Sequence, residues 1–297
     1  VMWPRRYERR SRANPLSQDL RSCGSTDRPP HLSRESLRST GVRMRILVTN
    51  DDGIFAPGIL ELSRALAPLG EVIVIAPERQ QSAAGHGITL HKPLRMTAVE
   101  IDAPVAEAWA TNGTPADCTI LAAANDRPKP DLVVAGINAG ANLGEEVLYS
   151  GTVSAAMEAT LQGFKSFAIS VTAYEQCIFG PAADFAAKLA RRLAEGSLPP
   201  DTFLNVNVPN LCVEELGPAT ITRLGRRRYM NSLEHRLDPR GRSYYWFSGE
   251  PLERDCEPGT DICTVQEGRV SITPVHFDMN FRGARGDLDL LLEGLVE

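Results

Sequence analysis

The chain has 297 residues, of which 42% are hydrophobic and 23% charged, and its formal net charge at pH 7 is −5. This is the composition of an ordinary globular protein, and the length suits one large domain or two modest ones. No apolar stretch approaches the roughly 20 residues needed to cross a bilayer, so we expect no membrane-spanning helix.

Residues 1–43 differ in composition from the rest of the chain. They hold ten arginines, no lysine and four acidic residues, about +6, which leaves about −11 for residues 44–297. They have few large apolar residues and no periodicity, which predicts disorder. A basic tail could bind nucleic acid or act as an organellar transit segment. We favour a third interpretation, that the tail is not native, because Met44 directly precedes the first expected strand.

From residue 45 onward, short apolar runs alternate with amphipathic stretches. We expect strands over residues 46–48, 72–76, 131–135, 167–171 and 203–208. We expect helices over residues 59–69, 152–162 and 182–195. This alternation predicts an α/β fold with a Rossmann-like, mainly parallel sheet and helices on both faces.

The pattern changes after about residue 211. Residues 219–222, 244–247 and 270–274 are typical of strands, and residues 288–295 of a closing helix. We interpret residues 220–262 as an antiparallel extension or arm off the main sheet. Trp246 and the pair Tyr244–Tyr245 suit core or subunit contacts better than a platform for bases.

Six cysteines are scattered along the chain without a C-x-x-C pair: Cys23, Cys118, Cys177, Cys212, Cys256 and Cys263. These spacings favour free thiols in a reducing, cytoplasmic compartment over a disulfide framework. No Cys and His cluster has zinc-ligand spacing, so no zinc site is expected.

Two adjacent carboxylates follow the first strand, in the sequence Asn50-Asp51-Asp52-Gly53. Asn, Asp and Gly also suit a plain turn, because they tolerate left-handed backbone geometry. However, polar, Gly-rich loops follow the second and third strands as well. The carboxyl ends of parallel strands share one edge of the sheet, so the three loops should converge. A turn explains one such loop but not the convergence of three.

Each loop offers a different chemical group. Asp51 and Asp52 supply anionic oxygens, while Ser82 and Asn138 supply neutral oxygens. This set suits one hard divalent cation, Mg²⁺ or Mn²⁺. Ser150-Gly151-Thr152 opens a helix, whose free N–H groups attract phosphate, although a plain N-cap is the alternative. We therefore expect a phosphate site lined by Asn50, Gly53, Asn138, Ser150, Gly151 and Thr152. His86 could touch substrate, but a loop histidine is more often simply solvated.

With these residues in view, the chain resembles the SurE family of stationary-phase survival proteins, which are metal-dependent 5′/3′-nucleotidases. The resemblance covers nearly all of residues 44–297 and is carried by RILVTNDDGIFAPGI, APERQQSAAGHGITL, NGTPADC, VVAGINAGANLGEEVLYSGTVSAAMEA and GTDICTVQEGRVSITP. It implies metal ligands at Asp51, Asp52, Ser82 and Asn138, a swapped C-terminal arm, and a homodimer or homotetramer. Glu145-Glu146 stands where aspartates are frequent in the family, and residues 225–260 form its variable part.

The expected function is a phosphomonoesterase that hydrolyses nucleoside 5′- and 3′-monophosphates, with short polyphosphate as a further substrate. Asp51 and Asp52 are the expected catalytic residues. Either water attacks directly or one of these aspartates attacks first, and both routes stay open. The rivals are a nucleotide-binding regulator without turnover and a metal-dependent transferase that uses a nucleotide sugar. The acidic body argues against a nucleic-acid surface on the folded domain.

Overall fold

The computed structural model describes residues 43–278, except 125–127, 227–228, 231–232, 248–249 and 252–255. The expected helix over residues 288–295 and the expected disorder of residues 1–42 lie outside the described residues. The helices are α1 (Pro57–Leu66), α2 (Pro115–Ala124), α3 (Gly151–Leu161), α4 (Phe179–Glu195) and α5 (Asp261–Gln266). Three short 3₁₀ helices are η1 (Ala67–Leu69), η2 (Gly144–Leu148) and η3 (Val213–Glu215).

The main sheet has nine strands in the order β3-β4-β2-β1-β5-β6-β7-β13-β8. They are β1 (Met44–Thr49), β2 (Gly70–Pro77), β3 (Met96–Ala98), β4 (Glu107–Thr111), β5 (Leu132–Ala139), β6 (Lys165–Val171), β7 (Thr202–Val208), β8 (Gly217–Ile221) and β13 (Arg269–His276). The six neighbouring strands β4, β2, β1, β5, β6 and β7 run parallel. At one end β3 pairs antiparallel with β4, and at the other β13 pairs antiparallel with β7 and parallel with β8. The prediction of a mainly parallel α/β sheet is confirmed.

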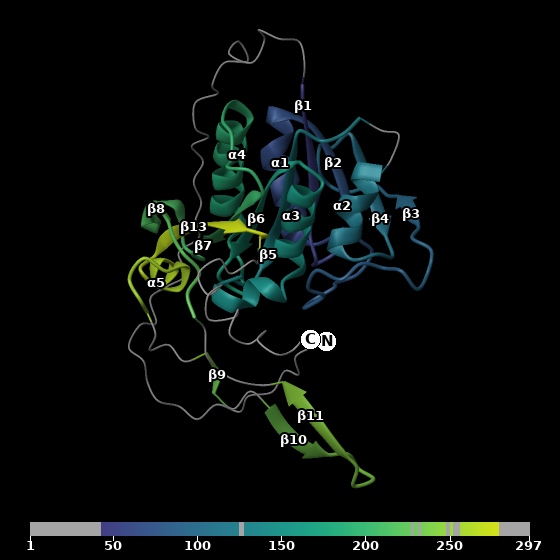
Figure 1. The fold of residues 1–297 in the computed structure, drawn as a ribbon, viewed down its shortest axis with the longest axis vertical. Coiled ribbons are helices and arrows are strands. Elements are labelled where there is room, and N and C mark those ends of the chain that lie inside the picture. The colour runs from purple at the N-terminus through teal and green to yellow at the C-terminus, as the bar shows by residue number, and fades with distance from the viewer. Residues whose placement is uncertain are drawn as a thin grey trace, which may run out of the picture.

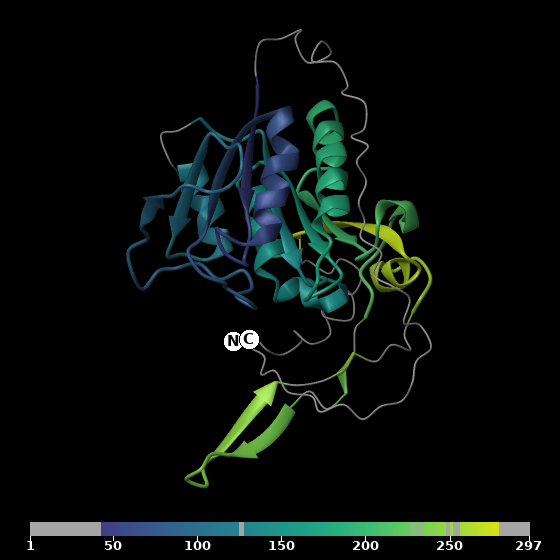
Figure 2. The ribbon, with the colours of Figure 1, turned by 180° about the vertical axis from the view of Figure 1, so that it is seen from behind.

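Helices cover both faces of this sheet. Figure 1 shows α2 and α3 side by side on one face, and Figure 2 shows α1 and α4 on the other. Successive strand residues point to opposite faces, so Ile46 packs with the α1 residue Ile59, whereas Leu47 packs with Cys118 of α2 and Ala159 of α3. In the described part of the chain, no helix has the length and apolarity that crossing a membrane requires.

The strand order decides where the polar loops lie. β2, β1 and β5 are neighbours and parallel, so the loops after Pro77, Thr49 and Ala139 leave the same edge of the sheet. The predicted convergence is therefore confirmed. The sequence did not predict β3, β4 or α2, because these elements are short and the face of α2 carries little apolar periodicity.

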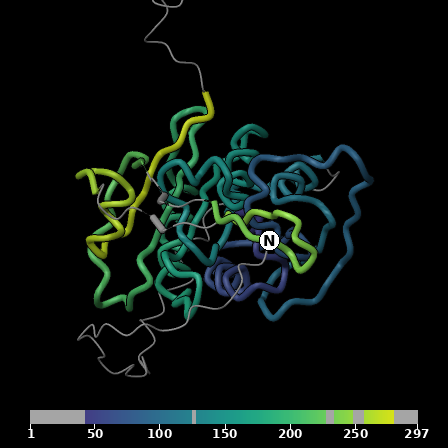
Figure 3. Tube along the Cα trace, turned by 90° about the horizontal axis from the view of Figure 1, so that it is seen from below, coloured from purple at the N-terminus to yellow at the C-terminus, as the bar shows by residue number. Residues whose placement is uncertain are grey.

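An arm departs from the sheet after β8. Its hairpin consists of β10 (Leu233–Leu237) and β11 (Ser243–Phe247), and β9 (Tyr229–Met230) pairs with β12 (Glu250–Pro251). The hairpin lies apart from the sheet in Figures 1 and 2, and Figure 3 shows it from below. Tyr245 is 60% exposed and Phe247 is 80% exposed. An antiparallel C-terminal extension is thus confirmed.

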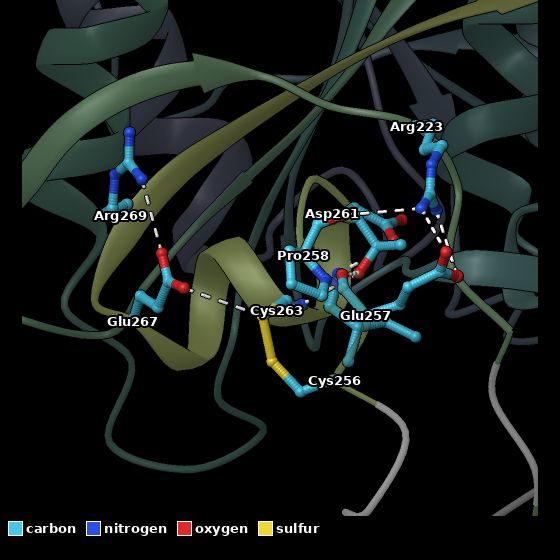
Figure 4. The surroundings of a disulfide bond; sticks show 10 residues. Arg223, Cys256, Glu257, Pro258, Asp261, Cys263, Glu267 and Arg269 are labelled. Carbon is cyan, nitrogen blue, oxygen red and sulfur yellow. Dashed lines mark hydrogen bonds and ion pairs between the residues drawn. A yellow bond between two sulfur atoms is a disulfide. The ribbon is translucent and has the colours of Figure 1, made fainter.

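A disulfide closes the base of this arm. Cys256 and Cys263 are joined by an S–S bond of 2.07 Å, beside the ion pair of Arg223 and Glu257 (Figure 4). The prediction of free thiols is wrong for these two residues. Their separation of seven residues gives no recognised motif, and they meet because the first turn of α5 brings their Cα atoms within 4.6 Å. Among the described residues, Cys118, Cys177 and Cys212 are free.

Candidate functional site

The carboxylate pair joins the three loops at the edge of the sheet. Asp51 is 6% exposed, and its Oδ1 accepts a hydrogen bond from the hydroxyl of Thr152, the second residue of α3. Asp52 Oδ2 accepts from the backbone N–H of Ala139 at 3.1 Å, and its Oδ1 accepts from Gln80 Nε2 at 3.3 Å. Asp51 therefore contacts the start of α3, whereas Asp52 contacts the end of β5 and the loop that follows β2.

The site holds its negative charge in a buried environment. Burial is the main cause that raises the pKa of Asp51 to about 6, and the charge of Asp52 adds to the increase. The Thr152 hydrogen bond offsets part of this effect. Burial also raises the pKa of Asp52, although Ala139 and Gln80 partly counter it. Two like charges in a desolvated pair favour the binding of a cation.

The neutral oxygens expected from the sequence belong to the same edge. Asn138 is near the end of β5, and its Nδ2 donates to the carbonyl of Gly140 at 2.7 Å, which leaves Oδ1 on the other side of the amide. Ser82 is exposed, and the residue before it, Gln81, donates its N–H to the Asp51 carbonyl at 2.7 Å. Ser82 thus follows a residue whose N–H is anchored to the backbone of Asp51.

The donor set fits a hard cation that keeps part of its water shell. Among the residues that the structure describes, no group of three or more His, Cys, Asp or Glu side chains could hold a metal. Two carboxylates alone do not complete a shell, so hydroxyl, amide and water oxygens would have to supply the rest. Mg²⁺ and Mn²⁺ accept such oxygen ligands, whereas zinc prefers nitrogen and sulfur.

The start of α3 lies directly against Asp51. A Cβ atom added to Gly151 would be 2.8 Å from Asp51 Cβ and 3.0 Å from Asp51 Oδ2, so a glycine is required for this approach. Ser150 is the N-cap, and its hydroxyl accepts from the N–H of Val153 at 3.1 Å. The N-cap role weighed from the sequence is confirmed for Ser150, and the helix N-terminus opens beside the carboxylates.

Two residues assigned to phosphate have structural partners here. The Asn50 side chain is buried and exchanges two hydrogen bonds with the backbone of Gly53, at 3.0 and 3.2 Å, so it shapes the turn that carries the aspartates. The Thr152 hydroxyl holds Asp51. Sequence reasoning did not single out Gln80 or the N–H of Ala139 as partners of Asp52, because nothing in a loop sequence shows which group reaches across to another strand.

Comparisons with known proteins identify the family of the chain. The model of the family described as survival protein SurE matches residues 46–231. A protein named 5′-nucleotidase SurE from Moorella thermoacetica is 56% identical over 238 residues, which cover 80% of this chain and 91% of that protein. Its namesake from Heliobacterium modesticaldum is 49% identical over 237 residues, 80% of this chain and 87% of that protein. The crystal structure of the SurE protein from Aquifex aeolicus superimposes with a TM-score of 0.75 at 39% identity, and covers 83% of this chain and 99% of that one.

Proposed function

Because the chain belongs to the SurE family of survival proteins, we propose that it is a metal-dependent phosphomonoesterase that hydrolyses nucleoside 5′-monophosphates. Several relatives carry the name 5′-nucleotidase, which supports the nucleotidase activity. The finer parts of the proposal are the use of one Mg²⁺ or Mn²⁺ per subunit and activity on 3′-monophosphates and short polyphosphate. A cytoplasmic location and a folded domain without a nucleic-acid surface remain predictions.

The residues of the site would act in the following way. Asp51 and Asp52 would bind the cation, with Ser82 and Asn138 completing the protein ligands. Such an ion, when bound, neutralises phosphate charge and lowers the pKa of a coordinated water. The Thr152 hydroxyl fixes the orientation of Asp51. Backbone N–H groups at the start of α3 would hold the phosphate oxygens that the cation does not neutralise.

One observation carries the proposal most directly, which is the contact between the carboxylate pair and a helix N-terminus. Gly151 approaches Asp51 so closely that no side chain could separate the two. A cation held by the aspartates would therefore lie beside an anion held by the helix. Phosphoryl transfer depends mainly on such positioning and charge neutralisation.

The direct test is phosphate release from a panel of substrates with and without Mn²⁺. The panel contains 5′- and 3′-mononucleotides, p-nitrophenyl phosphate and short polyphosphate. We expect release from the 5′-mononucleotides that depends on the added metal. Nucleotide binding without phosphate release would instead identify a regulator.

Substitutions at the helix start separate backbone from side-chain contributions. We expect Gly151→Ala to lower kcat/KM by about 10²–10³-fold, the effect of losing one preorganised donor, because the new Cβ displaces the helix start from Asp51. Ser150→Ala should cost about 1 kcal/mol of stability through the lost N-cap, with a smaller effect on turnover. Steady-state kinetics and thermal melting check both results. A larger loss of turnover in Ser150→Ala would assign the chemistry to the hydroxyl.

We propose in addition that the arm, residues 220–262, joins copies of the chain into a homodimer or homotetramer. A lone two-stranded hairpin is marginally stable in water, and the faces of β10 and β11 expose Leu233, Leu237, Tyr245 and Phe247. Aromatic side chains of this kind are enriched at the centres of interfaces. A second copy of the chain would bury them.

Replacing residues 229–251 by two glycines should reduce the oligomeric state and leave the metal site in place. The base of the arm can close without the hairpin, because Arg223 bridges to Thr260 across it. Sedimentation velocity measures the assembly, and Mn²⁺ binding serves as the control for the site. If the shortened protein contains the same number of subunits per particle as the parent, the arm is not part of the interface.

A further inference from the structure

The loop between β2 and β3, residues 78–95, carries the proposed ligand Ser82 and is called here the Ser82 loop. It contains no helix or strand, and a structureless loop of this length in a compact domain is usually functional or disordered. Its first part is anchored at the site, where Gln81 donates its N–H to the Asp51 carbonyl at 2.7 Å. What holds the rest of the loop decides where Ser82 lies.

A buried glutamate on α3 provides one attachment. Glu158 is 7% exposed, and its Oε2 lies 2.8 Å from Nε2 of His86 in the Ser82 loop. Its Oε1 accepts from Gln162 Nε2, also at 2.8 Å. The hydrogen bond from His86 is the main cause that lowers the pKa of Glu158, so this carboxylate is ionised and accepts from the imidazole. His86 is exposed, as expected of a loop histidine, but it also makes a hydrogen bond to a buried carboxylate that the sequence did not predict.

A buried aspartate on α2 provides a second attachment. Asp117 is 2% exposed, and its Oδ1 accepts from the N–H of Thr89 at 3.0 Å. Its Oδ2 accepts from the N–H of Thr114 at 2.8 Å, while the Thr114 hydroxyl donates to the Gly87 carbonyl at 2.8 Å. Asp117 thus holds the loop at Thr89, and Thr114 holds it at Gly87, both just after His86.

These attachments leave little freedom around Ser82. Gly85 donates its N–H to the Tyr149 carbonyl at 3.0 Å, so the chain is fixed at residue 81 and again at residue 85. Only residues 82–84 lie between these points, and Ala83 adopts a positive φ of 55°, which a non-glycine residue rarely does. The helices α2 and α3 that carry the two carboxylates pack side by side (Figure 1). The loop is therefore attached to two helices that pack against each other.

We propose that Glu158 and Asp117, through His86 and Thr89, are positioning residues that hold the Ser82 loop against Asp51 and present the Ser82 hydroxyl to the cation. This inference rests on the proposed metal-dependent function and adds to it the means by which the most exposed ligand is held. The residues come from three separate stretches, AGHGIT, TPAD and AAME. Outer partners of metal ligands typically contribute about 10–100-fold to metal affinity.

The first test measures the affinity for Mn²⁺ itself, by electron paramagnetic resonance of the free ion. We expect His86→Ala and Glu158→Gln each to raise the Mn²⁺ dissociation constant by about tenfold. His86 and Gln162 contact different oxygens of Glu158, and a glutamine would place an amide NH₂ donor against one of the two. His91→Ala, an exposed histidine in the same loop, is the matched control and should bind Mn²⁺ as the parent does. A lowered melting temperature with an unchanged Mn²⁺ dissociation constant would show a merely structural role and overturn the proposal.

A double-mutant cycle tests whether His86 acts through Ser82. Ser82→Ala should weaken Mn²⁺ binding, and adding His86→Ala to it should weaken binding little further, because the hydroxyl that the loop presents is already absent. Effects that add in full would mean that His86 acts independently of Ser82, which would overturn the proposal.

Hydrogen exchange provides a readout that needs no metal. In the metal-free protein, the peptide covering residues 79–90 should exchange faster in His86→Ala and Glu158→Gln than in the parent, and His91→Ala should match the parent. Unchanged exchange in the first two variants would overturn the proposal.

Asp51→Asn separates a failure of this inference from a failure of the proposed function. If Asp51→Asn still binds Mn²⁺ as tightly as the parent, the metal assignment itself fails. If Asp51→Asn loses Mn²⁺ while His86→Ala binds it as tightly as the parent, the function stands and the positioning role fails.

Discussion

Asp51→Asn and Asp52→Asn are each expected to abolish turnover while the protein remains folded. Each change keeps the shape of the side chain and removes one negative charge from a pair in which burial already disfavours that charge. Losing a single neutral donor at a catalytic site costs about 10²–10³ in rate, and losing a charged ligand should cost at least as much. Without metal, both variants should be as stable as the parent or slightly more stable, because the repulsion between the two carboxylates is relieved.

The same variants should also respond less to added metal. A ligand present at about 100 times its dissociation constant stabilises the native state by about 2.7 kcal/mol. At about 2–4 °C per kcal/mol for a domain of this size, the parent should gain about 5–10 °C in Tm with saturating Mn²⁺. The variants should lose most of this shift, and Asp184→Asn, an exposed change on α4, should keep it. Near-normal activity together with a normal shift in either variant would require the site to be rebuilt around other residues.

Asp261→Ala is expected to destabilise the protein by about 3–5 kcal/mol, since it leaves buried N–H groups without their acceptor. The Asp261 carboxylate is fully buried and accepts three backbone N–H groups, from Gly144 at 2.8 Å, Gly225 at 2.7 Å and Ile262 at 2.8 Å. These groups belong to the loop that follows β5, the start of the arm, and α5. Figure 4 shows that Asp261 lies beside Arg223 and the disulfide. One carboxylate therefore ties the site loop to the base of the arm.

Thermal melting should show the loss as a Tm lowered by about 6–20 °C. Asp184→Ala is the matched control, because it removes an aspartate from an exposed position and should change stability by no more than about 0.5 kcal/mol. Asp261→Asn should lie between the two, since an amide keeps one accepting oxygen. A melting temperature in Asp261→Ala equal to that of the parent would mean that water replaces the carboxylate at all three N–H groups.

The sequence alone predicted the main parallel sheet and the polar strand ends of the candidate site, although it missed β3, β4 and α2. Alternating apolar runs and amphipathic stretches predicted the parallel sheet and its two helical layers, because strands buried on both faces must be apolar throughout. The strand ends then placed Asp51, Asp52 and Asn138 at one edge, since parallel strands share their carboxyl ends. These inferences depend on local patterns and on one general rule of topology. They needed no knowledge of side-chain partners.

The tertiary structure decided which residue serves which purpose. Thr152 holds Asp51 from 101 residues away, His86 meets Glu158 across 72 residues, and Asp261 reaches Gly144 across 117. None of these pairs has a spacing that a sequence pattern could reveal. The disulfide between Cys256 and Cys263 likewise depends on where α5 begins after the arm returns. Local periodicity fixes which face of an element is buried, but only the packed chain determines which buried polar groups meet, because each must find its partner wherever the fold has placed it.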